Sequence, residues 1–264
     1  MAGSGATIRY EGEAGSARLT LAHGARFNAM TLGMWQALPE AIARAEADPD
    51  IRVIALTGEG EKAFCAGADI SEFGEQRSSA EQIERYNSAV AAANAALAAA
   101  TKPTIALIRG ICFGGGFGLA MACDLRLARA DARFRIPAAR VGLGYGHAGV
   151  ETMVRRIGMP AVAELLLSAR ILNGDEAYHY QIIHRLWSGE DFPALSEAYL
   201  TDMAGNAPLS MQAAKRSLIE LTMHEAERSP EAVDALVAAC FASEDYREGQ
   251  QAFLEKRRPV FRGR

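Results

Sequence analysis

The chain has 264 residues, of which 50% are hydrophobic and 23% are charged, a composition ordinary for a soluble globular protein with a large core. Its formal net charge of −4 gives no reason to expect nucleic acid or an anionic membrane as a partner. No apolar run is long enough to cross a bilayer, and the first ten residues lack the pattern of a secretory signal, so we expect a cytoplasmic protein.

The first half of the chain predicts strands that alternate with helices. Residues 7–10 and 17–21 suggest two strands, and Thr31 is placed to cap a helix that ends at Asp48. The β-branched run at 51–57 predicts a buried strand.

An alanine-rich helix is expected over about residues 80–100, followed by buried strands at 104–108 and 125–128 and a short one opened by Phe134. From about residue 150 the pattern is helical to the end. Alternation of strands and helices followed by a run of helices predicts an α/β fold with a parallel sheet and a helical C-terminal part.

Two glycine-containing segments follow predicted buried strands, FCAGADI at 64–70 and GICFGGGFG at 110–118. Ligands of open α/β sheets bind beyond the carboxyl ends of the strands, and a glycine-rich turn that opens a helix leaves N–H groups free for an anion. The alternative is that these glycines only make tight turns and close helix packing. No Lys-Ser or Lys-Thr follows them and their spacing is not GxGxxG, so a phosphate loop is excluded and dinucleotide binding is a weaker alternative.

The four cysteines show no pattern of a metal site or of a disulfide framework. They are widely scattered, with no CxxC pair and no histidine at zinc spacing: Cys65, Cys112, Cys123 and Cys240. We expect reduced, mostly buried thiols and no bound metal.

At these residues the chain resembles a known family. The two glycine segments, RFNAMTLGMW from Arg26, ARVGLG from residue 139 and FLEKRRPVFRGR at the end resemble, in this order, the enoyl-CoA hydratase/isomerase (crotonase) superfamily. The resemblance implies a ClpP-like ββα superhelical core with an acyl-CoA site at 1–200 and a helical oligomerisation region at 201–264. It also implies a homotrimer or hexamer, with coenzyme A present only as part of the thioester substrate and no other cofactor.

By position, the resemblance implies that the backbone N–H groups of Ala68 and Gly115 form an oxyanion hole. Such fixed donors stabilise the charge that develops when a thioester becomes an enolate. The implied contacts to coenzyme A are Arg26, Ala66, Asp69, Ile70, Lys256 and Arg257. For the individual cations among them, a solubilising role is the alternative.

The chain departs from the family's hydratases at two positions. These enzymes hold and activate water with two glutamates, and the matching positions here are Gly118 and Ala138. Without both carboxylates no evident general base activates water. Ordinary hydration is therefore doubtful.

Two residues of the glycine-rich loop at 142–149 are candidates for another chemistry. Tyr145 aligns with a tyrosine of the methylmalonyl-CoA decarboxylase branch, although the histidine of that branch is replaced by Ala68. His147 can titrate near neutrality and act as an acid or a base. The alternatives are an aromatic plug for Tyr145, a surface or helix-start histidine for His147, and a helix-start carboxylate for Glu151.

Three interpretations follow. The first is a family enzyme whose oxyanion hole works with Tyr145 or His147 in an isomerase, decarboxylase or other lyase step. The second is a catalytically weak acyl-CoA-binding homologue. The third is a nucleotide-binding α/β protein that uses its glycine loops for phosphate.

Overall fold

The computed structural model describes residues 5–72 and 78–264. Its main sheet has the order β1-β2-β3-β5-β7-β9, in which β1 is antiparallel to β2 and the other neighbours are parallel. The strands are β1 (Thr7–Glu13), β2 (Ser16–Ala22), β3 (Val53–Gly58), β5 (Thr104–Ile108), β7 (Leu125–Arg129) and β9 (Arg185–Trp187). Five of them confirm the strands that the sequence predicts. The sixth, β9, interrupts the C-terminal part that was expected to be helical.

A second, smaller parallel sheet has the order β4-β6-β8. Its three strands are β4 (Ala63–Cys65), β6 (Ile111–Phe113) and β8 (Arg133–Arg135). The strand β8 was expected from Phe134, whereas β4 and β6, which lie inside the two glycine-containing segments, were not expected. Because β4 and β6 pair with each other, these two segments leave the small sheet side by side.

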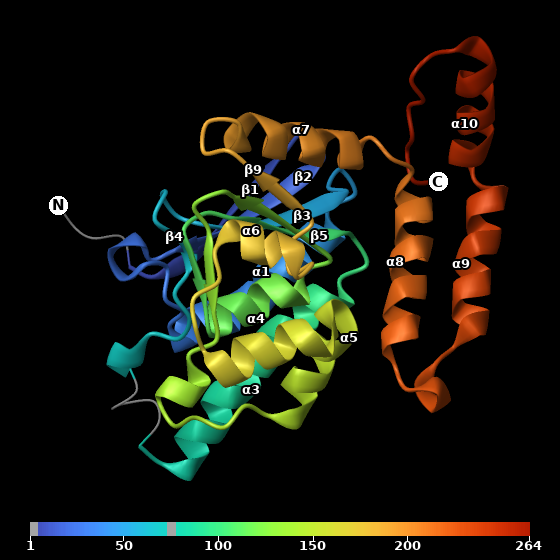
Figure 1. Cartoon of the computed structure of the whole chain (residues 1–264). Coiled ribbons are helices and arrows are strands. Elements are labelled where there is room, and N and C mark those ends of the chain that lie inside the picture. Colours follow the sequence, from blue (N-terminus) through green and yellow to red (C-terminus); the bar gives the residue numbers. More distant parts are fainter. Residues whose placement is uncertain (1–4, 73–77) are drawn as a thin grey trace.

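Helices cover both faces of the main sheet (Figure 1). In β3, Ile54 and Leu56 face the larger core. Val53 and Ala55 point to the opposite face, where they pack in a smaller core with Phe192, the first residue of α7. This alternation is the period-two pattern of a strand buried on both sides. The covering helices are α1 (Leu32–Ala47), α3 (Ala80–Ala99), α4 (Gly115–Ala122), α5 (His147–Ala163), α6 (Gly174–His179) and α7 (Phe192–Ala204).

The helix starts follow the capping residues of the sequence. The Thr31 hydroxyl accepts a hydrogen bond from Met34 N–H, which confirms the predicted cap of α1. Ser79 and Gln82 form a capping box at the start of α3. Five short helical turns complete the described chain, Gly24–Arg26, Ile70–Glu72, Ala138–Arg140 and Glu225–Glu227 as 3₁₀ turns and Glu164–Ser168 as a π turn.

Three C-terminal helices stand apart from the layered core (Figure 1): α8 (Pro208–Thr222), α9 (Pro230–Ala242) and α10 (Glu244–Glu255). The buried Lys215 ammonium of α8 joins them to the core, since it lies 2.8 Å from an Asp124 carboxylate oxygen and donates to the Lys102 carbonyl at 2.9 Å. The same carboxylate accepts a hydrogen bond from Thr104 N–H at 2.7 Å. Asp124 therefore has a structural role, since it links α8 to the start of β5.

The expected boundary between residues 200 and 201 falls within α7, and the division into two domains stays a prediction. Within the described ranges, none of the helices combines the length and the apolar character that spanning a membrane requires.

Candidate active site

The backbone of the loop after β4 is fixed against residues 27–30. Ala66 N–H donates to the Phe27 carbonyl at 3.0 Å, Met30 N–H donates to the Gly67 carbonyl at 2.8 Å, and Asp69 N–H donates to the Met30 carbonyl at 2.9 Å. The Gly67 carbonyl and the Ala68 N–H belong to one trans peptide group, in which C=O and N–H point in opposite directions. Because this carbonyl accepts from Met30, the N–H of Ala68 faces away from Met30. No acceptor for it is found in the part of the chain that the structure describes.

A second free donor lies at the start of α4. Gly114 takes a positive φ of 51° and donates its N–H to the Arg135 carbonyl, which turns the chain sharply into the helix. Gly115 is the first helical residue, so its N–H has no partner within the helix, and among the described residues it has none outside.

The two free donors are close together. A Cβ built on Gly115 would lie 3.8 Å from the Ala68 nitrogen, and one built on Gly67 would lie 3.4 Å from the Gly115 nitrogen. The Gly115 Cβ would also meet the buried Trp35 ring at 3.2 Å, a closer approach than side chains normally make. The structure thus brings Ala68 and Gly115 together as the sequence analysis expected, and Trp35 is a wall of the site that the sequence did not indicate.

The Cys65 thiol beside this loop is chemically unreactive. Cys65 is fully buried and accepts a hydrogen bond from Gly67 N–H at 3.4 Å. Burial raises the pKa of the Cys65 thiol to about 12. The thiolate, which is the reactive form, is therefore scarce at neutral pH. Cys112 and Cys123 are also buried, Cys240 is half-buried, and all four thiols are free.

Asp69 stabilises the loop through its side chain. Its Oδ1 accepts hydrogen bonds from Ser71 Oγ at 2.7 Å and Ser71 N–H at 2.9 Å. Burial alone would raise the pKa of Asp69, but these hydrogen bonds and the positive charges of His23 and Arg26 outweigh it, so the pKa lies below its ordinary value. Asp69 is a carboxylate at neutral pH and acts as an acceptor that shapes the turn.

The two hydratase positions lie next to the glycine turn. Gly118 is one turn after Gly115 in α4, and a Cβ there would have Asn94 Oδ1 as its nearest neighbour at 3.6 Å, an ordinary contact. Ala138 is buried at the start of its 3₁₀ turn. Its neighbour Pro137 would lie 3.8 Å from a Cβ on Gly114. Neither position carries a carboxylate.

Tyr145 and His147 lie in an exposed segment before and at the start of α5. The Tyr145 ring rests against α5, 3.1 Å from a Cβ built on Gly149, and burial raises the pKa of its hydroxyl although 36% of the residue is exposed. Within the described ranges, no hydrogen bond joins either residue to Ala68 or Gly115. Their catalytic role stays a prediction.

Glu151 of the same helix has partners of its own. Its carboxylate lies 2.8 Å from Arg155 and 3.7 Å from His224 Nε2. The hydrogen bond and charge of Arg155 hold the pKa of Glu151 below its ordinary value. These contacts agree with the structural interpretation of this carboxylate.

The expected contacts to coenzyme A fall into two groups. The first group, Arg26, Ala66, Asp69 and Ile70, lies on or beside the loop of Ala68; Asp69 is buried, Arg26 is exposed and Ile70 is 74% exposed. Lys256 and Arg257 follow α10, which Figure 1 shows far from α4. A single chain therefore does not bring the second group to the site.

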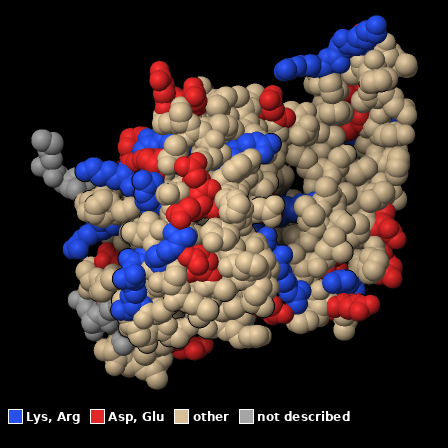
Figure 2. All heavy atoms as spheres, in the orientation of Figure 1, with Lys and Arg blue, Asp and Glu red and all other residues tan. Residues whose placement is uncertain are grey.

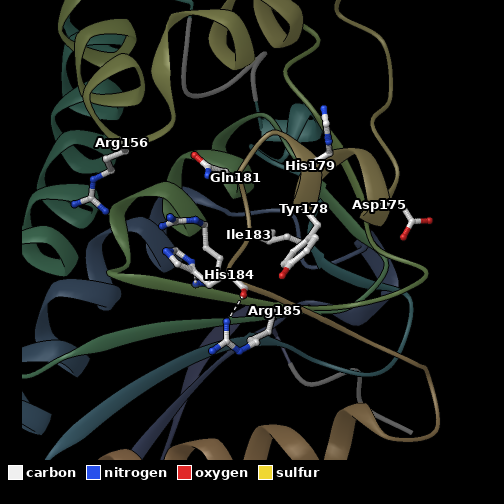
Figure 3. A pocket seen from close by; sticks show the side chains of 9 residues that line it. Arg156, Asp175, Tyr178, His179, Gln181, Ile183, His184 and Arg185 are labelled. Carbon is white, nitrogen blue, oxygen red and sulfur yellow. Dashed lines mark hydrogen bonds between the residues drawn. The ribbon is translucent and has the colours of Figure 1, made fainter.

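A second hollow of the described chain lies away from the two donors. A cavity of about 660 Å³ lies between β7, α5 and the segment from α6 to β9 (Figure 3). It contains three arginines, Arg126, Arg156 and Arg185, and half-buried His184. The sequence did not indicate this cavity, because its three arginines lie far apart in the chain and share no motif. No group of three or more His, Cys, Asp or Glu residues that could hold a metal is found in residues 5–72 and 78–264.

Comparison with known proteins gives the following matches. The family model described as enoyl-CoA hydratase/isomerase matches residues 11–264. A solved enoyl-CoA hydratase/carnithine racemase from Magnetospirillum magneticum is 34% identical, with a TM-score of 0.92 over 97% of this chain and 96% of the other. A carnitinyl-CoA dehydratase of Proteus mirabilis is 33% identical over 229 residues (85% of this chain, 87% of that protein). An (E)-benzylidenesuccinyl-CoA hydratase of Thauera aromatica is 32% identical over 226 residues (86% and 87%).

Proposed function

The chain belongs to the enoyl-CoA hydratase/isomerase family, and from this premise we propose that it is an enzyme that acts on a coenzyme A thioester through an enolate-like intermediate. The observation that carries the proposal is the pair of free N–H donors of Ala68 and Gly115, which belong to the two glycine segments and lie close together. The names of similar proteins, which include a crotonyl-CoA hydratase and a carnitinyl-CoA dehydratase, support the substrate class.

The two donors suit a thioester oxygen on which negative charge develops. They are held by the backbone, so they need little reorganisation when the charge forms. Gly115 also lies at the N-terminus of α4, where the helix dipole favours negative charge. This arrangement lowers the energy of an enolate regardless of how the enolate is made.

The missing carboxylates support a reaction other than simple hydration. With Gly118 and Ala138 in the hydratase positions, this part of the site offers no general base for water. Decarboxylation makes its enolate by losing carbon dioxide, and isomerisation needs a proton relay that Tyr145 or His147 could provide. We therefore favour a decarboxylase- or isomerase-type step.

A panel of thioesters tests this proposal. We expect turnover of a malonyl-type or a 3-enoyl thioester. Mass spectrometry of the products measures it. If every thioester binds and none reacts, the catalytically weak homologue is correct. If free nucleotides bind more tightly than acyl-CoA, the nucleotide-binding alternative replaces both.

Tyr145→Phe and His147→Ala separate the two candidate proton donors. We expect one of the two changes to lower kcat for the true substrate by about 10²–10⁴-fold, which is the usual contribution of general acid–base catalysis. Burial keeps the pKa of Tyr145 above its ordinary value, so its hydroxyl is protonated at neutral pH and acts as a donor. Steady-state kinetics of both variants, with the wild type measured alongside, give the answer. Unchanged kcat in both would remove this loop from the mechanism.

We propose that the C-terminal helices bind a second copy of the chain, in a trimer or hexamer. Figure 2 shows a largely uncharged area in the middle of the α8–α10 region, with charged residues at its top, right edge and bottom. Six large apolar side chains of these helices are exposed: Leu218, Leu221, Val237, Phe241, Phe253 and Leu254. Such an apolar surface is typical of an interaction site. We expect light scattering to give about three or six times the 28.2 kDa of one chain; a monomer at micromolar concentration would contradict this.

A further inference from the structure

The arginine-lined cavity has no role in the proposed reaction. Arg126 comes from β7, Arg156 from α5 and Arg185 from β9. In Figure 3, Arg156 and His184 lie on one side of the cavity and Tyr178 and Asp175 on the other. The positive charges thus come from three separate elements and meet only in the folded chain.

Arg126 is the most buried of the three cations, with 3% of the residue exposed. Its Nε donates to the Ile182 carbonyl at 2.6 Å and its Nη1 to the Cys123 carbonyl at 2.9 Å. Arg126 lines the cavity, and no acceptor for its Nη2 is found among the described residues. A buried guanidinium is normally neutralised by a carboxylate, and here it has only carbonyl partners.

The other two arginines repeat this pattern. Arg156 donates to the same Cys123 carbonyl at 2.7 Å, so two guanidinium groups converge on one oxygen. Arg185 donates to the His184 carbonyl at 2.8 Å, as the dashed line in Figure 3 marks. Within the described ranges none of the three arginines forms an ion pair, and the only carboxylate lining the cavity is that of Asp175, which forms none either.

The ionisable groups show the effect of this unbalanced charge. Burial and the charge of Arg126 lower the pKa of His184 to about 4, so its ring is neutral and its Nδ1 accepts a hydrogen bond from Arg126 N–H at 3.1 Å. Burial, together with the charge of Arg156, also lowers the pKa of Arg126, to about 10. Three cations therefore face one carboxylate at neutral pH.

We propose that this cavity is a binding site for a small molecule that carries a phosphate group. Arginine presents several N–H donors in a plane that matches the oxygens of phosphate, and charge-assisted hydrogen bonds of this kind are strong. The volume of about 660 Å³ lies within the range of small-molecule sites. The Tyr178 ring on the opposite wall could contact an organic part of the ligand.

The site is separate from the proposed oxyanion hole. Cys123 follows the last residue of α4, whereas Gly115 is its first. Eight helical residues span about 12 Å, so a phosphate group held at the arginines is separated from the two amide donors by about the length of this helix. The proposal therefore stands or fails independently of the proposed thioester chemistry.

Calorimetric titration at constant ionic strength tests the proposal, with inorganic phosphate and glycerol phosphate as the two probes. We expect saturable binding of at least one, and binding at least about tenfold weaker in Arg156→Gln and in Arg185→Gln, since each loses a charge-assisted contact. Neither Arg156 nor Arg185 lies in the deepest core, so we expect both variants to fold. In Arg156→Gln, the Cys123 carbonyl still accepts a hydrogen bond from Arg126. Tighter binding of the phosphate alone would indicate the free ion; tighter binding of the ester would indicate an organic phosphate.

Arg133→Gln is the matched control, because Arg133 is exposed, donates to backbone carbonyls and lies outside the cavity. We expect it to bind like the wild type. Arg26→Gln removes a cation beside the proposed coenzyme A site, and a loss confined to this variant would place the phosphate there and overturn the proposal. Absence of saturable binding, or equal loss in the control, would overturn it too. Succinate, a dicarboxylate without phosphate, is titrated for comparison. If it binds more tightly than both phosphates, the proposal of a phosphate site is overturned.

Discussion

Replacement of Ala68 by proline is expected to lower kcat for the thioester substrate by about 10²–10³-fold, the usual effect of removing one oxyanion donor. Proline has no N–H, so this change deletes the donor itself. The loop does not depend on that N–H, because its backbone hydrogen bonds to residues 27–30 come from Ala66, Gly67 and Asp69. Ala68 also has no positive φ that proline would have to reverse.

Ala68→Ser is the matched control, since it keeps the N–H and changes the side chain of a half-buried residue only slightly. We expect it to retain most of the activity. Steady-state kinetics, the Kd for a saturated acyl-CoA and circular dichroism would be compared in the three proteins. The expected pattern is a loss of kcat with little change in Kd. A folded Ala68→Pro protein with wild-type kcat would mean that this donor does not act on the substrate.

The double variant Gly118→Glu/Ala138→Glu is expected to gain crotonyl-CoA hydration by about 10²–10⁴-fold over the wild type, because it supplies the missing acid–base pair. Gly118 can accept the side chain, since the nearest atom to its Cβ would be Asn94 Oδ1 at 3.6 Å. Glutamate is also a better helix former than glycine. Ala138 is buried, so its glutamate carries a desolvation cost that raises its pKa.

The gain is measured by the loss of the conjugated thioester absorbance. Gly189→Glu is a control, since it adds the same carboxylate at an exposed position outside the site. Each single variant at Gly118 or Ala138 is expected to gain less than the pair, because one carboxylate both holds and activates water less well than two. A folded double variant that binds acyl-CoA but hydrates no faster than Gly189→Glu would show that more than these two residues separates this chain from a hydratase.

The long elements could be predicted because their patterns extend over many residues. The β-branched run of β3 and the capped, periodic sequence of α1 each carry their own signal. The strands β4 and β6 have three residues each. A strand this short shows no periodicity and is fixed by its tertiary neighbours, so the small sheet could not be predicted from the sequence.

The two loops of the candidate site could be located from their glycines, but the geometry between them could not be predicted. The approach of Gly115 to Ala68 depends on the positive φ of Gly114 and on the Trp35 ring, which come together only in the folded chain. The arginine cavity was even harder to predict. Arg126, Arg156 and Arg185 follow one another at intervals of about thirty residues, and they share no motif.

Hydration of crotonyl-CoA by the wild-type protein at high enzyme concentration is the most direct test of the central claim, that an oxyanion hole acts here without the hydratase carboxylates. We expect no loss of the conjugated thioester absorbance above the background rate, together with measurable binding of the thioester. Rapid hydration would contradict it, and would mean that a group other than residues 118 and 138 activates water in this site.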